Sequence, residues 1–421
     1  MMFSIPWTNR KMTSAQLWMI CLIIINVAIF LKAWRFYGSH IGGYDGQMYY
    51  AYVRSWVIDG DLDFKNEFYS LTPRRSHIPV FDLTPTGLVP NKYPIGFGLI
   101  SFPFFVLAHF LTLAGSHWNS ILLKPNGYSV LYDLLVHFGH LICGMAGIFF
   151  SYKFLRKYFE EKWTILAVTA VWFSTCLVYY GTVFLTMAHI SGFFTISALY
   201  YLCSQLRWQS RWHVFLAIGG LAGLSLVLRP TNIVLLVFPA YLFFVLLFSA
   251  KDCRLRQCVG KMFLCLCAFC TIIALQMMAW KILYGTYICY SYDSEGFFFR
   301  NPKIFQILYS DNHGLFSSFP ITWLCLVGLA LAALKERKVE ILLFSLSMVL
   351  LIYVNASWHC WWFGDSFGAR AFTEAGLIFC FGLAYFMQNM VKRFSRGVVL
   401  CGILTLWNFY MMAVYVTTQY R

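Results

Sequence analysis

Residues 14–34 read SAQLWMICLIIINVAIFLKAW, a run that is almost entirely apolar. A helix of about 20 such residues is long enough to cross the hydrocarbon core of a bilayer. Lys32, Trp34 and Arg35 come at its end without a small-residue cleavage pattern, so the run is predicted to be a membrane anchor rather than a signal peptide.

The rest of the chain repeats this pattern. Of its 421 residues, 60% are hydrophobic and only 12% are charged, which excludes a soluble domain and a disordered chain. Ten more runs are predicted to span the membrane: 130–152, 163–181, 187–206, 213–228, 231–249, 262–284, 317–334, 339–356, 371–390 and 397–417. The sequence therefore predicts an all-α polytopic membrane protein with about eleven transmembrane helices.

The net charge of +15 is explained by sidedness, and no basic run points to a nucleic-acid partner. Basic clusters between the apolar runs should face the cytoplasm, and they do so only if one further segment, 93–113, is re-entrant or interfacial. The chain then starts inside and ends outside as a single integral membrane domain, 1–421. Three polar segments, 36–129, 285–316 and 355–370, are predicted to be external.

Asp45 stands in the sequence Gly42-Gly43-Tyr44-Asp45-Gly46, just beyond the outer end of the first span. A carboxylate there could take a proton from an acceptor nucleophile or hold a metal, with glycines allowing close approach of a ligand. The alternative is a helix N-cap, because an amphipathic run follows over residues 47–58.

A second acidic group, Asp59, Asp61 and Glu67, lies further along the same external segment. Its oxygens could bind a divalent metal ion or provide a second carboxylate for the site. A solvated turn is the alternative, and the spacing is not that of an EF-hand. No other cofactor is indicated.

Four cations outside the basic clusters, Lys92, Arg229, Lys303 and Arg370, could hold a phosphate. Three of them could instead contact lipid headgroups. Arg229 differs because it interrupts apolar sequence beside Pro230, where an ionisable residue is a functional candidate.

Aromatic and histidine side chains gather in the external segments and could bind a sugar or an acceptor. The candidates are Tyr44, Tyr93, His313, Trp358 and Trp362. An interfacial aromatic belt is the alternative. His189 falls inside an apolar run and is predicted to be a core residue.

The order of these motifs resembles that of the bacterial membrane glycosyltransferases of the GT-C superfamily. The resemblance runs from about residue 40 to 375 and rests on Gly43–Gly46, Tyr50–Ser55, Asp59–Phe64, Asn91–Gly96, Leu228–Thr231, His313–Phe316 and Ser366–Phe372. It implies ten or more spans, juxtamembrane helices in the first external loop, and a cavity open to the outer face of the membrane.

Relatives such as protein O-mannosyltransferases and the lipid A aminoarabinose transferase use a polyprenyl-phosphate sugar donor and invert the anomeric carbon. The resemblance implies that Asp45 activates the acceptor, which could be a membrane lipid, a polysaccharide or a protein. It also implies a bacterial inner-membrane location with the site facing the periplasm, or the lumen in a eukaryote. The Asp-Glu pair common in the family is missing, because Gly46 follows Asp45.

A non-catalytic transporter or flippase of a lipid-linked sugar or small solute is the alternative function. Such a protein should place several ionisable residues at the bilayer midplane. In this sequence they gather at the predicted outer interface, which favours the enzyme.

Overall fold

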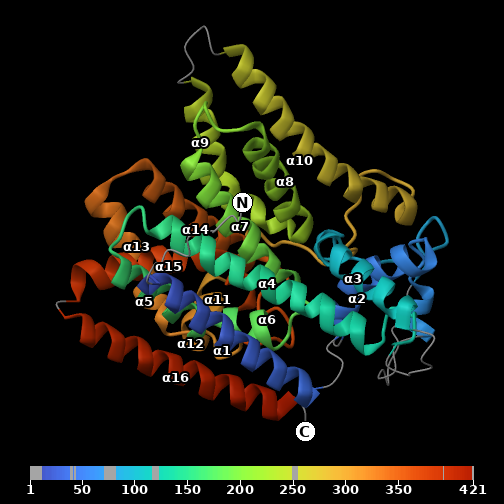
Figure 1. Ribbon diagram of the computed structural model, residues 1–421, viewed down its shortest axis with the longest axis horizontal. Helices are drawn as coiled ribbons and strands as arrows, with labels where there is room; N and C mark the ends of the chain where they lie inside the picture. The colour runs from blue at the N-terminus through green and yellow to red at the C-terminus, as the bar shows by residue number, and fades with distance from the viewer. Residues whose placement is uncertain are drawn as a thin grey trace, which may run out of the picture.

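Backbone polar groups have no partner in lipid, so apolar runs of this length must become helices. The computed structural model of the protein describes residues 12–37, 41, 44–70, 82–115, 123–248, 255–391 and 393–419. It is 76% helical, and no strand occurs among the described residues. The predicted all-α membrane fold is confirmed (Figure 1).

Each predicted span coincides with a helix or with two consecutive helices. These are α1 (Ser14–Tyr37), α4 (Val130–Leu155), α5 (Glu161–Phe173) with α6 (Cys176–Thr182), α7 (Ala188–Gln205), α8 (Trp212–Leu228), α9 (Val237–Phe248), α10 (Leu255–Tyr284), α13 (Ile321–Glu336), α14 (Val339–Ser357), α15 (Gly376–Met390) and α16 (Phe394–Gln419). The other elements are α2 (Tyr44–Arg54), α3 (Gly96–Gly115), α11 (Ile304–Tyr309), α12 (Leu315–Ser318) and the short turns η1 (Ser55–Asp59), η2 (Asn66–Ser70), η5 (Pro230–Leu236) and η7 (Arg370–Ala375).

The number of crossings is lower than eleven when judged by length and apolarity alone. Eight helices in the described part of the chain qualify as spans, or nine if α5 and α6, bent by 71° at their junction, make one span. Helices α8 and α13 have 17 and 16 residues and fall short of the required length. The protein is an integral multi-pass membrane protein, and the count of eleven is not confirmed.

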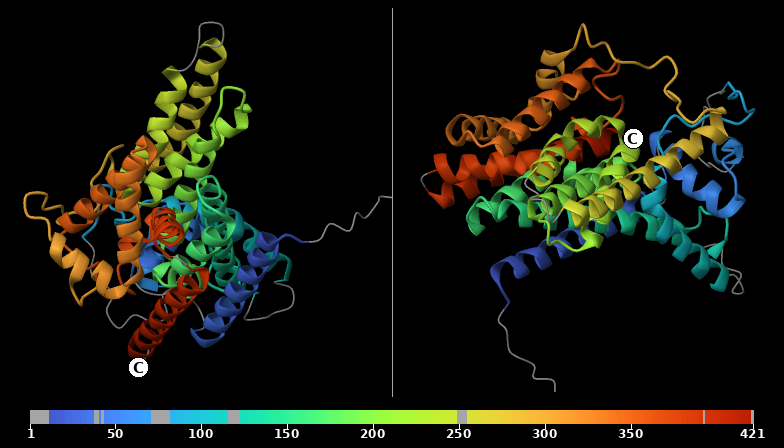
Figure 2. Two further views of the ribbon diagram at one scale, coloured as in Figure 1. Left: turned by 90° about the vertical axis from the view of Figure 1, so that its left-hand side faces the viewer. Right: turned by 90° about the horizontal axis from the view of Figure 1, so that it is seen from above.

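Three helices lie at the periphery and present apolar side chains to their surroundings. At most 17% of the apolar windows of α1, α10 and α16 is buried, against 89% for the segment Arg370–Met390. Figures 1 and 2 show these three helices on the outside of the bundle. Exposed side chains such as Ile24, Phe263 and Leu406 form the surface expected against lipid tails.

Helices α2 and α3 lie at the end of the bundle where α1 ends and α4 begins (Figure 1). Gly96 lets α3 start directly against the end of α8, because a Cβ on Gly96 would lie 2.4 Å from the carbonyl oxygen of Val227. Helix α3 has the length and apolarity of a span, so its predicted re-entrant course stays a prediction.

Two breaks in apolar segments bring charged residues to the centre of the molecule. Helix α8 ends at Leu228, and Pro230, which has no N–H group to donate, starts the tight turn η5 instead of continuing the helix. The turn η7 begins with Arg370 and precedes α15. Arg229 and Arg370 from these breaks, and Asp45 from α2, line one cavity.

Candidate active site

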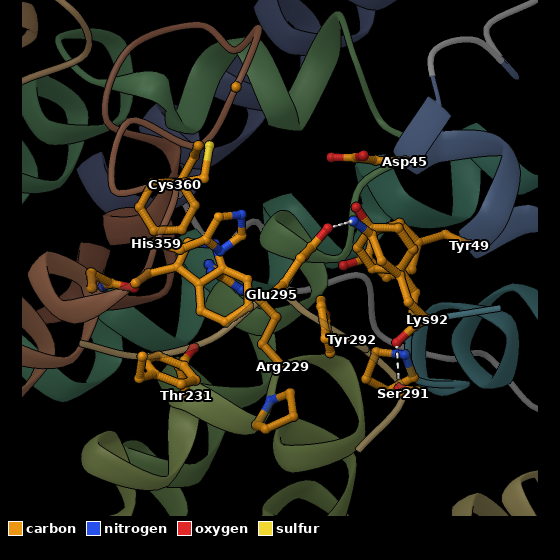
Figure 3. A pocket seen from close by; sticks show the side chains of 18 of the residues that line it. Asp45, Tyr49, Lys92, Arg229, Thr231, Ser291, Tyr292, Glu295, His359 and Cys360 are labelled. Atoms are coloured by element: carbon orange, nitrogen blue, oxygen red, sulfur yellow. Dashed lines mark hydrogen bonds and ion pairs between the residues drawn. The ribbon is translucent and has the colours of Figure 1, made fainter. Parts of the chain in front are cut away.

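A cavity of about 450 Å³ lies between α2, the loop before α3, the two breaks and the loops after α10 and α14 (Figure 3). It is formed by segments far apart in sequence. The lining residues are Asp45, Tyr49, Lys92, Tyr93, Pro94, Met187, His189, Arg229, Pro230, Thr231, Trp280, Cys289, Tyr290, Ser291, Tyr292, Glu295, Phe297, Asn355, Trp358, His359, Cys360, Phe363, Gly364 and Arg370.

Asp45 forms an ion pair with Arg370. Its Oδ2 atom lies 2.9 Å from Nη2 of Arg370. Burial alone would raise the pKa of Asp45, but the guanidinium of Arg370 and a hydrogen bond from Tyr93 outweigh burial and lower that pKa below its ordinary value. Asp45 is the second residue of α2 rather than the residue before it, so the structure does not place it at the N-cap. The carboxylate is therefore charged and held at the cavity wall.

Lys92 is surrounded by three tyrosine rings. Its ammonium lies 5.7 Å from the ring centre of Tyr44, 5.5 Å from Tyr93 and 5.8 Å from Tyr292. Glu295, from the loop after α10, accepts a hydrogen bond from Lys92 at 2.6 Å (Figure 3). Cation–π contacts and an ion pair keep this ammonium at the cavity wall.

Arg229 forms a third ion pair, with Glu374 of η7. Its Nη1 atom lies 3.2 Å from Oε2 of Glu374, and Nδ1 of His189 lies 3.1 Å from Oε1 of the same carboxylate. Glu374 is only 1% exposed and does not line the cavity, whereas Arg229 and His189 do. The buried carboxylate thus holds two cavity side chains from behind.

Glu374 and Glu295 were not among the residues predicted from the sequence, and His189 was predicted only as a core residue. His189 is indeed buried, but it also lines the cavity. Glu374 had a usable signal, because it is the sole acidic residue in the apolar run 371–390, and such residues are functional candidates. Glu295 had none, since its pairing with Lys92 spans 203 positions.

Aromatic rings form the wall beside these charges. The ring of Trp358 lies 4.7 Å from that of Phe297 and 5.6 Å from that of Tyr292. An isolated backbone bridge joins residues 297 and 358, so the loops that follow α10 and α14 are connected here. Flat apolar faces beside hydrogen-bonding groups are suited to a sugar ring.

Several predicted site residues lie elsewhere. His313 and Trp362 contact each other, with Nδ1 of His313 2.9 Å from the carbonyl oxygen of Trp362, but neither lines the cavity. Lys303 precedes α11 and donates its backbone N–H to Ala356. Tyr44 does not line the cavity, but its ring contacts Lys92, which does. Gly42 and Gly43 lie outside the described residues.

The second acidic group surrounds Arg54 and not the cavity. Glu67 accepts a hydrogen bond from Arg54 at 2.8 Å, and Asp59 pairs with the same guanidinium. Asp61 accepts a hydrogen bond from the hydroxyl of Ser55. Across the described ranges, no group of three or more His, Cys, Asp or Glu side chains could hold a metal ion.

No protein-family model matches the sequence, and no curated protein matches it significantly. The fold is similar to that of ArnT from Cupriavidus metallidurans in the apo state, with a TM-score of 0.53 and 12% identity over 92% of this chain. The archaeal oligosaccharyltransferase AglB from Archaeoglobus fulgidus, solved with an inhibitory peptide and a dolichol-phosphate, gives a TM-score of 0.47 and 12% identity over 96% of this chain. This chain spans 63% of the ArnT chain and 56% of the AglB chain. The likeness to ArnT confirms the predicted fold, and at 12% identity it shows the fold alone.

Proposed function

We propose that this protein is an inverting glycosyltransferase. It would move a sugar from a polyprenyl-phosphate donor to an acceptor hydroxyl at the outer face of the membrane. The observation that carries the proposal is the ion pair between Asp45 and Arg370, set in a cavity with Lys92 and Arg229. The likeness of the fold to ArnT, a lipid A aminoarabinose transferase, supports it.

In this mechanism Asp45 accepts the proton of the acceptor hydroxyl. The acceptor oxygen forms a bond to the anomeric carbon as the bond from that carbon to the phosphate oxygen breaks. Attack from the face opposite the phosphate inverts the anomeric centre. The polyprenyl phosphate leaves with both electrons of the broken bond, and Lys92, Arg229 and Arg370 stabilise its charge.

Because Asp45 contacts Arg370, the basicity of Asp45 would depend on whether the donor is bound. While Arg370 pairs with Asp45, the pKa of Asp45 is lowered, and the carboxylate is a weak base. A donor phosphate near Arg370 would compete for its hydrogen bonds and leave Asp45 more basic. Proton abstraction would then be favoured only with donor in place.

The aromatic wall would receive the sugar. Trp358 and Phe297 offer faces for stacking, and Tyr93 and His359 offer polar atoms at the same cavity. The isoprenoid tail would leave the cavity towards the lipid-facing helices. The acceptor could be a membrane lipid, a polysaccharide or a protein, and the proposed location is the bacterial inner membrane with the cavity open to the periplasm.

The test is transfer of radiolabelled sugar from a panel of polyprenyl-phosphate sugars, with and without a divalent ion, using purified wild type and Asp45→Asn at equal amounts. Asp311→Asn is the matched control, because Asp311 is an exposed external aspartate that does not line the cavity. We expect Asp45→Asn to lose transfer and Asp311→Asn to retain it. Equal transfer by Asp45→Asn would overturn the role of Asp45. Absence of transfer by wild type, together with uptake of a lipid-linked sugar in proteoliposomes, would instead support the transporter.

A further inference from the structure

We propose that Glu295 occupies, on Lys92, the place that the phosphate of the donor takes during catalysis. It would act as a built-in competitor that sets which anions the cavity accepts. The inference rests on the proposed binding of a lipid-linked phosphate and adds to it a specificity-determining residue. It comes from the way the cavity cations are paired.

Each cation of the cavity already has a carboxylate partner. Lys92 pairs with Glu295, Arg229 with Glu374 and Arg370 with Asp45. These three pairs cancel in charge, so as it stands this set offers an incoming anion no net attraction. A phosphate can gain a full cation only if one carboxylate gives way.

Glu295 is the carboxylate best placed to give way. Its side chain is 29% exposed, compared with 23% for Asp45 and 1% for Glu374. Glu374 is fixed by both Arg229 and His189, and Asp45 sits on a helix. Glu295 instead stands in the loop between α10 and α11, in a turn closed by its N–H donating to the carbonyl of Tyr292.

Lys92 is the cation best prepared for the exchange. At 22% exposure it is the most accessible of the three, compared with 15% for Arg370 and 14% for Arg229. Its three tyrosine rings and the hydrogen bond from Ser291 to its backbone carbonyl do not involve Glu295. The ammonium would therefore stay in place when the carboxylate leaves. A compact, rotatable ammonium can exchange one oxyanion for another without a fixed geometry.

The charge balance gives the exchange a consequence for selectivity. Displacing Glu295 leaves this set of side chains with one positive charge. That matches a donor with one phosphate, which carries one negative charge when esterified on both sides. A diphosphate link brings a second charge, and a second carboxylate would have to leave a more buried pair.

The test measures binding of a short-chain polyprenyl methyl phosphate, a diester with one negative charge, and of the methyl diphosphate of the same chain length, which carries two. Trp280 and Trp358 line the cavity, so quenching of tryptophan fluorescence in detergent reports binding without any sugar transfer. The variant is Glu295→Gln, which keeps the shape and removes the charge. Asp293→Asn is the matched control, since Asp293 is exposed on the same loop, and asparagine tolerates its positive φ of 52°.

We expect Glu295→Gln to bind the monophosphate about tenfold more tightly than wild type, because the carboxylate that competes with the phosphate for the ammonium of Lys92 is removed. The diphosphate should gain by a similar factor, because each ligand then needs one carboxylate fewer to leave its cation, and Asp293→Asn should behave as wild type. When Lys92 is also changed to methionine, Glu295→Gln should not increase the affinity for the monophosphate.

Unchanged or weaker binding by Glu295→Gln, with its thermal unfolding intact, would overturn the inference, as would an equal gain in the Lys92→Met background. The proposed function can be rejected independently of this inference. If Glu295→Gln tightens binding but no donor yields sugar transfer, the proposed phosphate site is supported and the proposed glycosyltransferase activity is rejected. If transfer occurs but Glu295→Gln leaves the KM for the donor unchanged, the transferase stands and the role of Glu295 does not.

Discussion

Glu374 influences the cavity without touching it. The carboxylate binds Arg229 and His189, which come from two different helix boundaries, and it is itself 1% exposed. A cation held by a buried partner has a fixed position, whereas one paired at the surface can change partners. The contrast between Glu374 and Glu295 can be measured by comparing how much a substitution at each position lowers the free energy of unfolding.

We predict that Glu374→Gln lowers the free energy of unfolding by about 3–5 kcal/mol, because it leaves Arg229 without its buried counter-charge. Glu295→Gln should cost about 1 kcal/mol or less, since its pair with Lys92 is partly exposed. Denaturation of both variants in the same detergent gives the comparison. Equal losses would contradict the assignment of one pair as fixed and the other as exchangeable.

Glu67 should make the stability of the first external loop depend on pH. Burial raises the pKa of Glu67 to about 7, even though Arg54 lies beside it, and its second oxygen has no partner among the described residues. A carboxyl whose pKa is higher in the folded state than in the unfolded state keeps its proton on folding. Its contribution is present at low pH and is lost as the pH rises through about 7.

We therefore predict that Glu67→Gln flattens the dependence of the unfolding midpoint on pH between about pH 5 and 8. Wild type should lose stability over this range relative to the variant, because glutamine imitates the protonated side chain. Asp311→Asn, changed at an exposed carboxylate, should follow wild type. Parallel curves for wild type and Glu67→Gln would show that the charge of Glu67 does not differ between the folded and unfolded states.

At the scale of elements, helices α13 and α15 pack at backbone contact through two glycines. A Cβ on Gly328 would lie 2.0 Å from the carbonyl oxygen of Gly382, and one on Gly382 would lie 2.0 Å from that of Cys325. Small residues of this kind let membrane helices approach closely and gain van der Waals contact. This close contact fixes the position of α15. Because α15 directly follows η7, the contact also fixes the charged residues that η7 carries at the cavity.

We predict that Gly382→Ala destabilises the protein by about 1–3 kcal/mol, because the added methyl group forces two backbones apart. Gly402→Ala on α16 is the control, since a Cβ there meets nothing within 4 Å and alanine favours the helix. The midpoint of thermal unfolding should fall for the first variant only. A neutral Gly382→Ala would mean that the α13–α15 contact has room to relax.

The sequence predicted the helices better than their breaks. Each predicted apolar run coincides with a helix or with two consecutive helices, and Pro230 identified the break after α8, because proline has a local effect on the backbone. The 71° bend between α5 and α6 was not predicted. It lies at Ser174 and Thr175, and Ser174 hydrogen-bonds to Thr405, a partner 231 positions away that no local pattern reveals.

The same limit applied to the site. Lys92, Arg229, Arg370 and Asp45 were predicted, and all four line the cavity. Arg229 interrupts apolar sequence, Asp45 is flanked by glycines, and the other two are cations in polar segments. Which carboxylate faces which cation depended on packing between distant segments. For that reason the second carboxylate of the site was predicted at Asp59, Asp61 or Glu67, whereas the carboxylates that pair with the cavity cations Lys92 and Arg229 are Glu295 and Glu374.

At the scale of the whole molecule, the sidedness of the cavity depends on α13. This helix has 16 residues and is about 24 Å long, which is shorter than the roughly 30 Å hydrocarbon core. The predicted topology nevertheless needs it to cross, because the external loop before it contributes to the site and a basic cluster, Lys335 to Lys338, follows it. The bilayer would have to become thinner around this short helix, or the residues that flank it would have to extend their side chains to the membrane surface.

We predict that an epitope inserted after Asp311 is accessible from outside intact bacterial spheroplasts, and that one inserted after Arg337 becomes accessible only after permeabilisation. Both positions are exposed in the structure, and α13 separates them. Accessibility of both tags would mean that α13 does not cross, and one crossing would be lost from the predicted topology. Reversed accessibility would turn the cavity to the cytoplasm, where a periplasmic donor could not reach Asp45, and the proposed transfer at the outer face would fail for reasons of topology even with the chemistry of the site unchanged.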